Sequence, residues 1–242
     1  MSNPNESGNV NNANSFEELI AVCTDFGPPY NPGNPEITIS AMNVSLTATR
    51  AAMQTANVQK AVWDVAVDAK EEAFAPLGER ARRVMAAANA SPLTQNQKAD
   101  IRYLVMKLTG RRVSTPVPDP ANPGGTISSS QMGYDQRAEN LDKLIQLLAV
   151  MPGYNPNEPE LTVAGLTSFH ASLVAASTAE AIAKQPYASA ITARNELLYK
   201  APNGLTYLAI AVKNYVKSLF GVSSPQYKRV AAIRFTKRRH YA

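Results

Sequence analysis

The sequence predicts an all-α protein made of two similar helical modules, and three observations support this. Alanine, leucine and valine supply most of the apolar residues, and the first two have high helix propensity. Apolar residues recur three and four positions apart, which is the spacing of one helix face. A proline-rich stretch occurs twice with a helical pattern around it. The 242 residues are enough for one large or two small domains.

The repeated stretch reads YNPGNPEITISAM over residues 30–42 and YNPNEPELTVAGL over residues 154–166, an offset of 124 positions. Each copy joins an Asn-Pro pair to a second proline, and prolines stop a preceding helix and favour extended or turn geometry. Thr38 and Thr162 then lie at helix N-cap positions. We therefore predict a rigid corner, in each copy, between a short helix and a long one.

Apolar residues on both sides of each cap predict a hydrophobic staple. Ile37 precedes its cap and can pack on Met42, as Leu161 can on Leu166. The helical stripe before the corner is also repeated, in residues Phe16, Leu19, Ile20 and Cys23 and in residues Leu141, Leu144, Ile145 and Leu148. Turns that recur by chance would not carry these flanking patterns with them, so we interpret the repeat as duplication of a helical module.

The first copy predicts about four helices. We expect them over residues 15–26, 38–60, 63–90 and 94–108, with a break in the third near Pro76 and Gly78. Ser15 and Glu18 have the spacing of a capping box at the start of the first helix.

The second copy predicts the same order of elements. We expect helices over residues 135–150, 162–184, 189–200 and 205–220. A final helix is expected to begin at Ser224-Pro225, because serine is a good N-cap and proline is favoured in the first helical position.

These elements divide the chain into four segments. Residues 1–14 are expected to form a polar N-terminal tail, and residues 15–113 the first module. Residues 114–133 hold four prolines and three glycines, and predict a linker or long loop. Residues 134–242 form the second module with a basic end. The two modules could be separate bundles or one fused bundle, and the linker length permits either.

Composition limits the classes of protein to be considered. Cys23 is the only cysteine, so an intrachain disulfide and a cysteine-based zinc site are excluded, and a small buried side chain is expected. The polar N-terminus has no signal-peptide pattern. No apolar stretch approaches the roughly 20 residues that span a bilayer. We therefore expect a soluble, cytoplasmic protein.

The search for catalytic motifs gives no candidate. His170 lies in a helical stretch with Thr167 three residues before it, which excludes the Glu-x-x-His pattern of di-iron bundles. The phosphate-binding loop and the Gly-x-Ser-x-Gly elbow are absent from the sequence. Neighbouring carboxylates such as Glu71 and Glu72 point about 100° apart on a helix. We expect no catalytic residue, no metal and no cofactor.

Basic residues are concentrated at the C-terminal end. No acidic residue follows Glu196, whereas the first 196 residues hold 15 basic and 19 acidic groups, a net charge of −4. Eight basic residues are candidates for contact with nucleic acid or an acidic partner, because such side chains bind phosphates and nearby aromatic rings stack on bases. They are Lys213, Lys217, Lys228, Arg229, Arg234, Lys237, Arg238 and Arg239. The alternative is a solvated face, or pairing with the acidic body of the same chain.

The function favoured by the sequence is that of a non-enzymatic structural or interaction protein that forms homo-oligomers. A net charge of +5 with its positive part at one end could bring copies together head to tail. The first alternative is nucleic-acid binding through the basic end. The second is a small-molecule site between helices.

Overall fold

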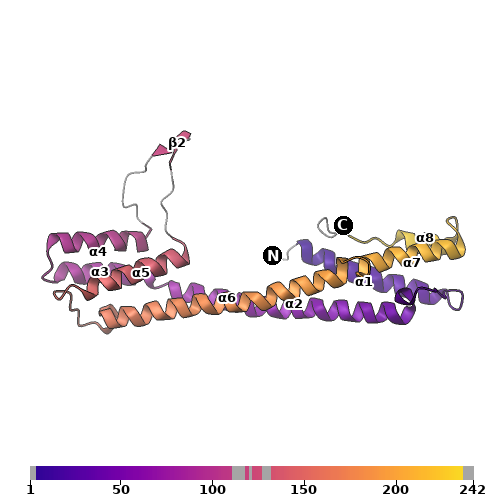
Figure 1. Cartoon of the computed structure of the whole chain (residues 1–242), viewed down its shortest axis with the longest axis horizontal. Coiled ribbons are helices and arrows are strands. Elements are labelled where there is room, and N and C mark those ends of the chain that lie inside the picture. Colours follow the sequence, from indigo (N-terminus) through magenta and orange to yellow (C-terminus); the bar gives the residue numbers. More distant parts are fainter. Residues whose placement is uncertain (1–3, 111–117, 120–121, 127–131, 237–242) are drawn as a thin grey trace. The chain divides into compact units, whose positions relative to one another are not determined.

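The computed structural model describes residues 4–110, 118–119, 122–126 and 132–236. Apart from one small hairpin, this part of the chain is helical, which confirms the predicted all-α class (Figure 1). The α-helices are α1 (Pro4–Asp25), α2 (Ile39–Phe74), α3 (Leu77–Ala90), α4 (Gln95–Leu108), α5 (Tyr134–Ala149), α6 (Val163–Tyr199), α7 (Leu205–Phe220) and α8 (Pro225–Ala232). Two short 3-10 helices, η1 (Pro35–Ile37) and η2 (Pro159–Leu161), precede α2 and α6.

The hairpin lies in the segment predicted to be a linker. Strand β1 (Pro118–Asp119) pairs antiparallel with strand β2 (Asn122–Thr126). We expected no regular structure here, because the segment has no alternating apolar pattern. Strands this short need only a few extended residues, and the fixed φ of proline is compatible with extended backbone.

Both long helices continue where we predicted breaks. Helix α2 runs without interruption through residues 61–62, because no proline or glycine lies there to end it. Helix α6 continues through Pro186, which we had placed between two helices. Proline removes one helical hydrogen bond and crowds the preceding turn. Pro186 is exposed, so water can solvate the carbonyl group that loses its partner.

Helix α1 begins at Pro4, so the predicted tail over residues 1–14 is wrong for the part that the structure describes. The predicted capping box at Ser15 is wrong as well, since that residue lies inside the helix. Buried polar contacts explain the difference. The Asn12 side chain accepts a hydrogen bond from the backbone N–H of Thr236 (2.8 Å) and donates one to its carbonyl oxygen (3.0 Å). The Tyr199 hydroxyl donates to Oδ1 of Asn9 (2.7 Å).

The chain forms two compact units, and they do not follow the predicted module boundaries. Unit 1 consists of Met1–Val62 and Lys184–Ala242, and unit 2 consists of Trp63–Ala183. Helices α2 and α6 each contribute residues to both units. Each unit therefore combines a segment of the first predicted module with a segment of the second.

The core of unit 1 is built from α1, the start of α2, α7 and α8. Phe16 and Leu19 are fully buried with Val212 of α7 and Val230 of α8. The rings of Phe26 and Phe220 meet edge to face with centroids 5.2 Å apart. Residues more than 150 positions apart in the sequence thus form one apolar cluster.

The core of unit 2 is built from the end of α2, α3, α4, α5 and the start of α6. Phe74, Leu77, Ile101 and Leu144 are buried in it with Leu166 of α6. The N-cap of helix α4 is Thr94, whose hydroxyl oxygen accepts a hydrogen bond from the Gln97 N–H at 3.3 Å.

Candidate functional site

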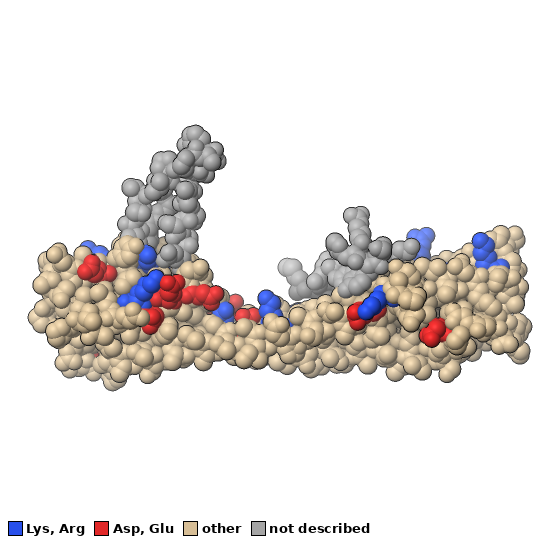
Figure 2. All heavy atoms as spheres, viewed as in Figure 1, with Lys and Arg blue, Asp and Glu red and all other residues tan. Residues whose placement is uncertain are grey.

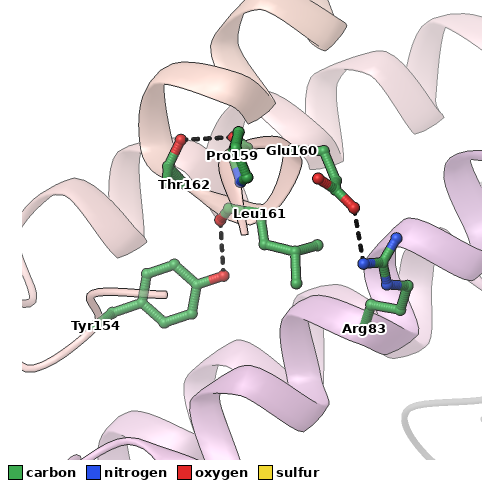
Figure 3. Close-up of polar contacts among 6 residues, drawn as sticks. All are labelled: Arg83, Tyr154, Pro159, Glu160, Leu161 and Thr162. Carbon is green, nitrogen blue, oxygen red and sulfur yellow. Dashed lines mark hydrogen bonds and ion pairs between the residues drawn. The ribbon is translucent and has the colours of Figure 1, made fainter. Parts of the chain in front are cut away.

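The two proline corners have matching hydrogen bonds. In the first corner (residues 30–38) the Tyr30 hydroxyl donates to the Ile37 carbonyl oxygen at 2.7 Å. In the second corner (residues 154–162) the Tyr154 hydroxyl donates to the Leu161 carbonyl oxygen at 2.9 Å (Figure 3). Burial raises the pKa of Tyr30 above its usual range, and raises the pKa of Tyr154 to about 12. Both phenols therefore keep their protons at neutral pH and act as donors.

Threonine caps the long helix in both corners, as predicted. Oγ1 of Thr38 accepts a hydrogen bond from the Ala41 N–H at 3.3 Å, and Oγ1 of Thr162 accepts one from the Gly165 N–H at 3.0 Å. Each hydroxyl also donates to a proline carbonyl oxygen three residues earlier, at 3.0 and 2.8 Å. The residues of the predicted staples are all buried, in pairs within one core: Ile37 and Met42, Leu161 and Leu166.

Each corner packs on a helix from the other half of the chain, but through different side chains. The first corner contacts α7: the Asn31 N–H donates to the Tyr215 hydroxyl at 3.2 Å, and the Tyr30 and Tyr215 rings meet edge to face at 5.3 Å. The second corner contacts α3 through an ion pair of 2.7 Å between Arg83 and Glu160 (Figure 3). A backbone hydrogen bond of Glu160 and the bond from Arg83 lower the pKa of that carboxyl group.

Helices α3 and α7 bury the same positions. The buried residues follow one spacing with an offset of 128 between the helices: Leu77, Ala81, Val84 and Ala88, and Leu205, Ala209, Val212 and Val216. With this alignment Ala87 of α3 takes the position of Tyr215 in α7. The aromatic side chain that fills the space beside the first corner is therefore replaced by a methyl group beside the second.

An open groove of about 680 Å³ lies between α3 and the second corner. Apart from Leu161, its apolar lining consists of small or proline side chains: Ala86, Ala87, Ala90, Pro92, Pro152 and Pro156. Arg83, Asn157 and Glu158 add polar groups at the same groove. The backbone N–H of Asn155, another lining residue, has no hydrogen-bond partner among the described residues. The groove thus combines apolar walls with an available donor.

Sequence reasoning missed this groove. The offset of 124 between the copies ends with α6, and α3 and α7 align only after a shift to 128. Aligning the buried stripes of these two helices would have shown alanine where the other copy has tyrosine. The comparison needs the helix pairing, because Ala87 and the second corner become neighbours only in the fold.

Two of the predicted basic site residues are used in packing. Lys213 is partly buried, and its ammonium group donates a hydrogen bond to the Ile233 carbonyl oxygen. The same ammonium nitrogen lies 5.4 Å from the centroid of the Phe235 ring. Burial lowers the pKa of Lys213. Arg229 forms an ion pair of 2.7 Å with Asp25.

Three other basic residues are available to a partner. Lys217, Lys228 and Arg234 are exposed, and their side chains have no hydrogen-bond or ion-pair partner among the described residues. On the face drawn in Figure 2, blue atoms near α7 and α8 form separate patches rather than one continuous surface. Lys237, Arg238 and Arg239 lie outside the described residues.

Within the described part of the chain, no group of three or more histidine, cysteine, aspartate or glutamate residues could hold a metal ion. His170 is partly buried in α6. Cys23 is buried, and burial raises the pKa of its thiol to about 11. No helix among the described residues is long and apolar enough to cross a bilayer.

The described part of the chain is therefore largely helical, with two related corners and an open groove beside the second. Comparison with protein-family models, with curated proteins and with solved structures gave no match to this chain.

Proposed function

We propose that the protein is a non-enzymatic structural or interaction protein, built from a duplicated helical module, whose copies assemble through exposed helix faces. The observation that carries this proposal is the outward face of α2. A helix at the surface of a globular protein normally has one apolar stripe toward the core and polar residues on the opposite side. Helix α2 departs from that pattern.

The core stripe of α2 in unit 1 contains Met42, Leu46, Thr49 and Ala56, all buried. A second stripe starts two residues later and so lies about 200° around the helix. It consists of exposed, uncharged residues with alternating spacings of four and three: Val44, Ala48, Ala51, Thr55, Val58 and Val62. The exposed fractions of its three valines are 67%, 48% and 50%, so these side chains are open to a partner.

Spacings of four and three residues are those of a coiled-coil seam, in which the stripe of one helix packs on that of another. A second copy of the chain supplies a matching stripe. Charge supports the same reading: Arg50 and Lys60 are the charged residues within residues 44–62, neither belongs to the stripe, and Arg50 is paired with Glu17 at 2.7 Å. The stripe itself therefore brings no charged side chain into the contact.

The size of the stripe sets the strength of the contact. It is about 27 Å long at 1.5 Å per residue, and a helix is about 10 Å wide. The area of about 270 Å² is well below the roughly 800 Å² that each partner buries in a stable interface. We therefore expect weak, concentration-dependent association. Residues 163–179 of α6 also contain no lysine, arginine, aspartate or glutamate, and so give unit 2 a similar uncharged surface.

The duplication in this proposal is supported by the geometry of the corners and of α3 and α7. Equivalent tyrosine and threonine hydrogen bonds recur with an offset of 124. Each unit joins the first elements of one copy to the last elements of the other, so the two halves exchange partners.

Light scattering across protein concentration tests assembly. The mass of the wild-type chain is expected to rise above 26.0 kDa with concentration. Combined Val44→Glu and Val58→Glu should hold the protein at monomer mass, because two charges would be buried without partners. The control changes the preceding exposed residues, Asn43→Glu and Asn57→Glu, about 100° around the helix. A single species at 26.0 kDa at every concentration would refute the proposal.

Nucleic-acid binding is a second candidate, favoured by the exposed, unpaired Lys217, Lys228 and Arg234. The test is the affinity for a labelled single strand across a salt series. Three phosphate contacts should give a slope of log affinity against log salt near −2, from about −0.7 per contact. Changing all three residues to alanine should flatten the slope, whereas Lys143→Ala, which removes a paired side chain of α5, should not. Binding that is independent of salt would exclude this candidate.

A further inference from the structure

We propose that the groove of unit 2 binds a tyrosine side chain presented by a peptide segment, in the position that Tyr215 occupies in unit 1. The inference rests on the duplication within the proposed function, because it uses one half of the chain as a template for the other. It goes further by assigning a ligand class to a groove.

Unit 1 shows how a phenol fits beside a proline corner. The Tyr215 ring meets the Tyr30 ring edge to face, with centroids 5.3 Å apart and planes at 83°. Its hydroxyl oxygen accepts a hydrogen bond from the Asn31 N–H at 3.2 Å. The ring therefore supplies apolar contact, and the hydroxyl oxygen shares the Asn31 N–H with the Pro29 carbonyl oxygen, which accepts from it at 3.0 Å.

Unit 2 has the same corner without the filling ring. Tyr154 and Asn155 take the positions of Tyr30 and Asn31, with the tyrosine bonded to its carbonyl in the same way. Ala87 takes the position of Tyr215, and Ala86 and Ala90 flank it along α3. The space is an open groove of about 680 Å³, and pockets that hold small ligands measure about 300–1,000 Å³. Asn155 and Ala87, the counterparts of Asn31 and Tyr215, both line this groove.

The lining selects for a phenol rather than for a purely apolar group. The Asn155 N–H has no partner in the described part of the chain, so a hydroxyl oxygen can accept its hydrogen bond. The three prolines of the lining offer apolar surface for the ring. Asn157, Glu158 and the Arg83–Glu160 pair supply polar groups for the backbone of a peptide that carries the ring.

The test is a nitrogen–proton NMR titration of the full chain, with N-acetyl-tyrosinamide as the probe. Amide signals of Gly153, Asn155 and Ala87 are expected to shift together as the probe is added. N-acetyl-phenylalaninamide should bind about threefold to tenfold more weakly, since it lacks one hydrogen-bonding hydroxyl. Absence of these shifts, or equal shifts with both probes, would overturn the assignment of a phenol.

Two variants make the result specific. Ala87→Tyr should fill the groove with the chain's own ring and abolish the probe shifts at Asn155. Tyr215→Ala should open the equivalent space in unit 1, so that probe shifts then also occur at the Asn31 amide. The second variant leaves unit 2 unchanged and keeps the test decisive if the first fails to fold. Probe shifts at Asn155 that persist in folded Ala87→Tyr would contradict the proposal.

The outcomes separate this inference from the proposed function. Titration is performed at a concentration where light scattering gives the monomer mass, so failure of assembly leaves the groove test intact. If Tyr215→Ala gains a site at Asn31 while the wild-type chain shows none at Asn155, the two corners are not equivalent and the groove proposal is wrong.

Discussion

The buried tyrosine of each corner is the residue whose role is most sharply defined. Tyr30 and Tyr154 each satisfy a buried carbonyl oxygen seven residues later, at 2.7 and 2.9 Å. Replacing either by phenylalanine leaves that acceptor unpaired, which costs about 1–3 kcal/mol. We expect both variants to lower the midpoint of urea unfolding by similar amounts. Tyr103→Phe, at an exposed position, is the control and should leave the midpoint unchanged. A loss in only one corner would show that the two bonds are not equivalent.

The same residues predict a loss of stability at alkaline pH. Burial raises the pKa of Tyr154 to about 12, whereas an exposed tyrosine titrates near 10. A raised pKa in the folded state means that the stabilisation is complete below pH 10 and is lost as pH rises toward 12. Urea midpoints at pH 8 and pH 11 measure this loss. Tyr154→Phe removes one ionising group, so its midpoint should fall less between these pH values than that of the wild type.

Among the elements, α6 carries the clearest prediction. Pro186 lies inside the helix and is exposed, and it aligns with Val62 of α2 at the offset of 124. Proline in a helix interior is about 3 kcal/mol less favourable than alanine. Pro186→Ala should therefore raise the melting temperature, and Val62→Pro should lower it. If Pro186→Ala lowers the melting temperature instead, the packing around residue 186 depends on a backbone geometry that proline imposes and alanine does not.

Local signals predicted the starts of several helices but not all of them. Thr38, Thr162 and Ser224 cap helices as expected, because a cap depends on residues within one turn. The start of α1 was missed because its asparagines look like a solvated tail. Their partners, Thr236 and Tyr199, lie more than 180 positions away. The groove was missed for the same reason, since α3 meets the second corner only in the fold.

At the scale of the whole molecule, the pairing of the halves was the feature that the sequence left open. Periodicity predicts which face of a helix is buried. When two copies share one pattern, however, an apolar face can pack within its own copy or against the other copy. Both cores in the structure mix the halves. The core of unit 1 joins Phe16 to Val212, and the core of unit 2 joins Leu77 to Leu144. The predicted linker over residues 114–133 therefore separates the two copies in the sequence, but it does not separate the two compact units.

This exchange predicts the behaviour of a cut chain. A specific protease site introduced between residues 113 and 134 would produce two fragments, each holding half of both cores. Because separation would expose apolar surface in both units, at about 25 cal/mol per Å², the fragments should stay together near 26.0 kDa in light scattering at low concentration. They should separate only where urea also unfolds the helices. The uncut chain with the same inserted site is the control. Two fragments that separate without denaturant, each still helical by circular dichroism, would mean that each half packs its own core, and the exchange would then be wrong.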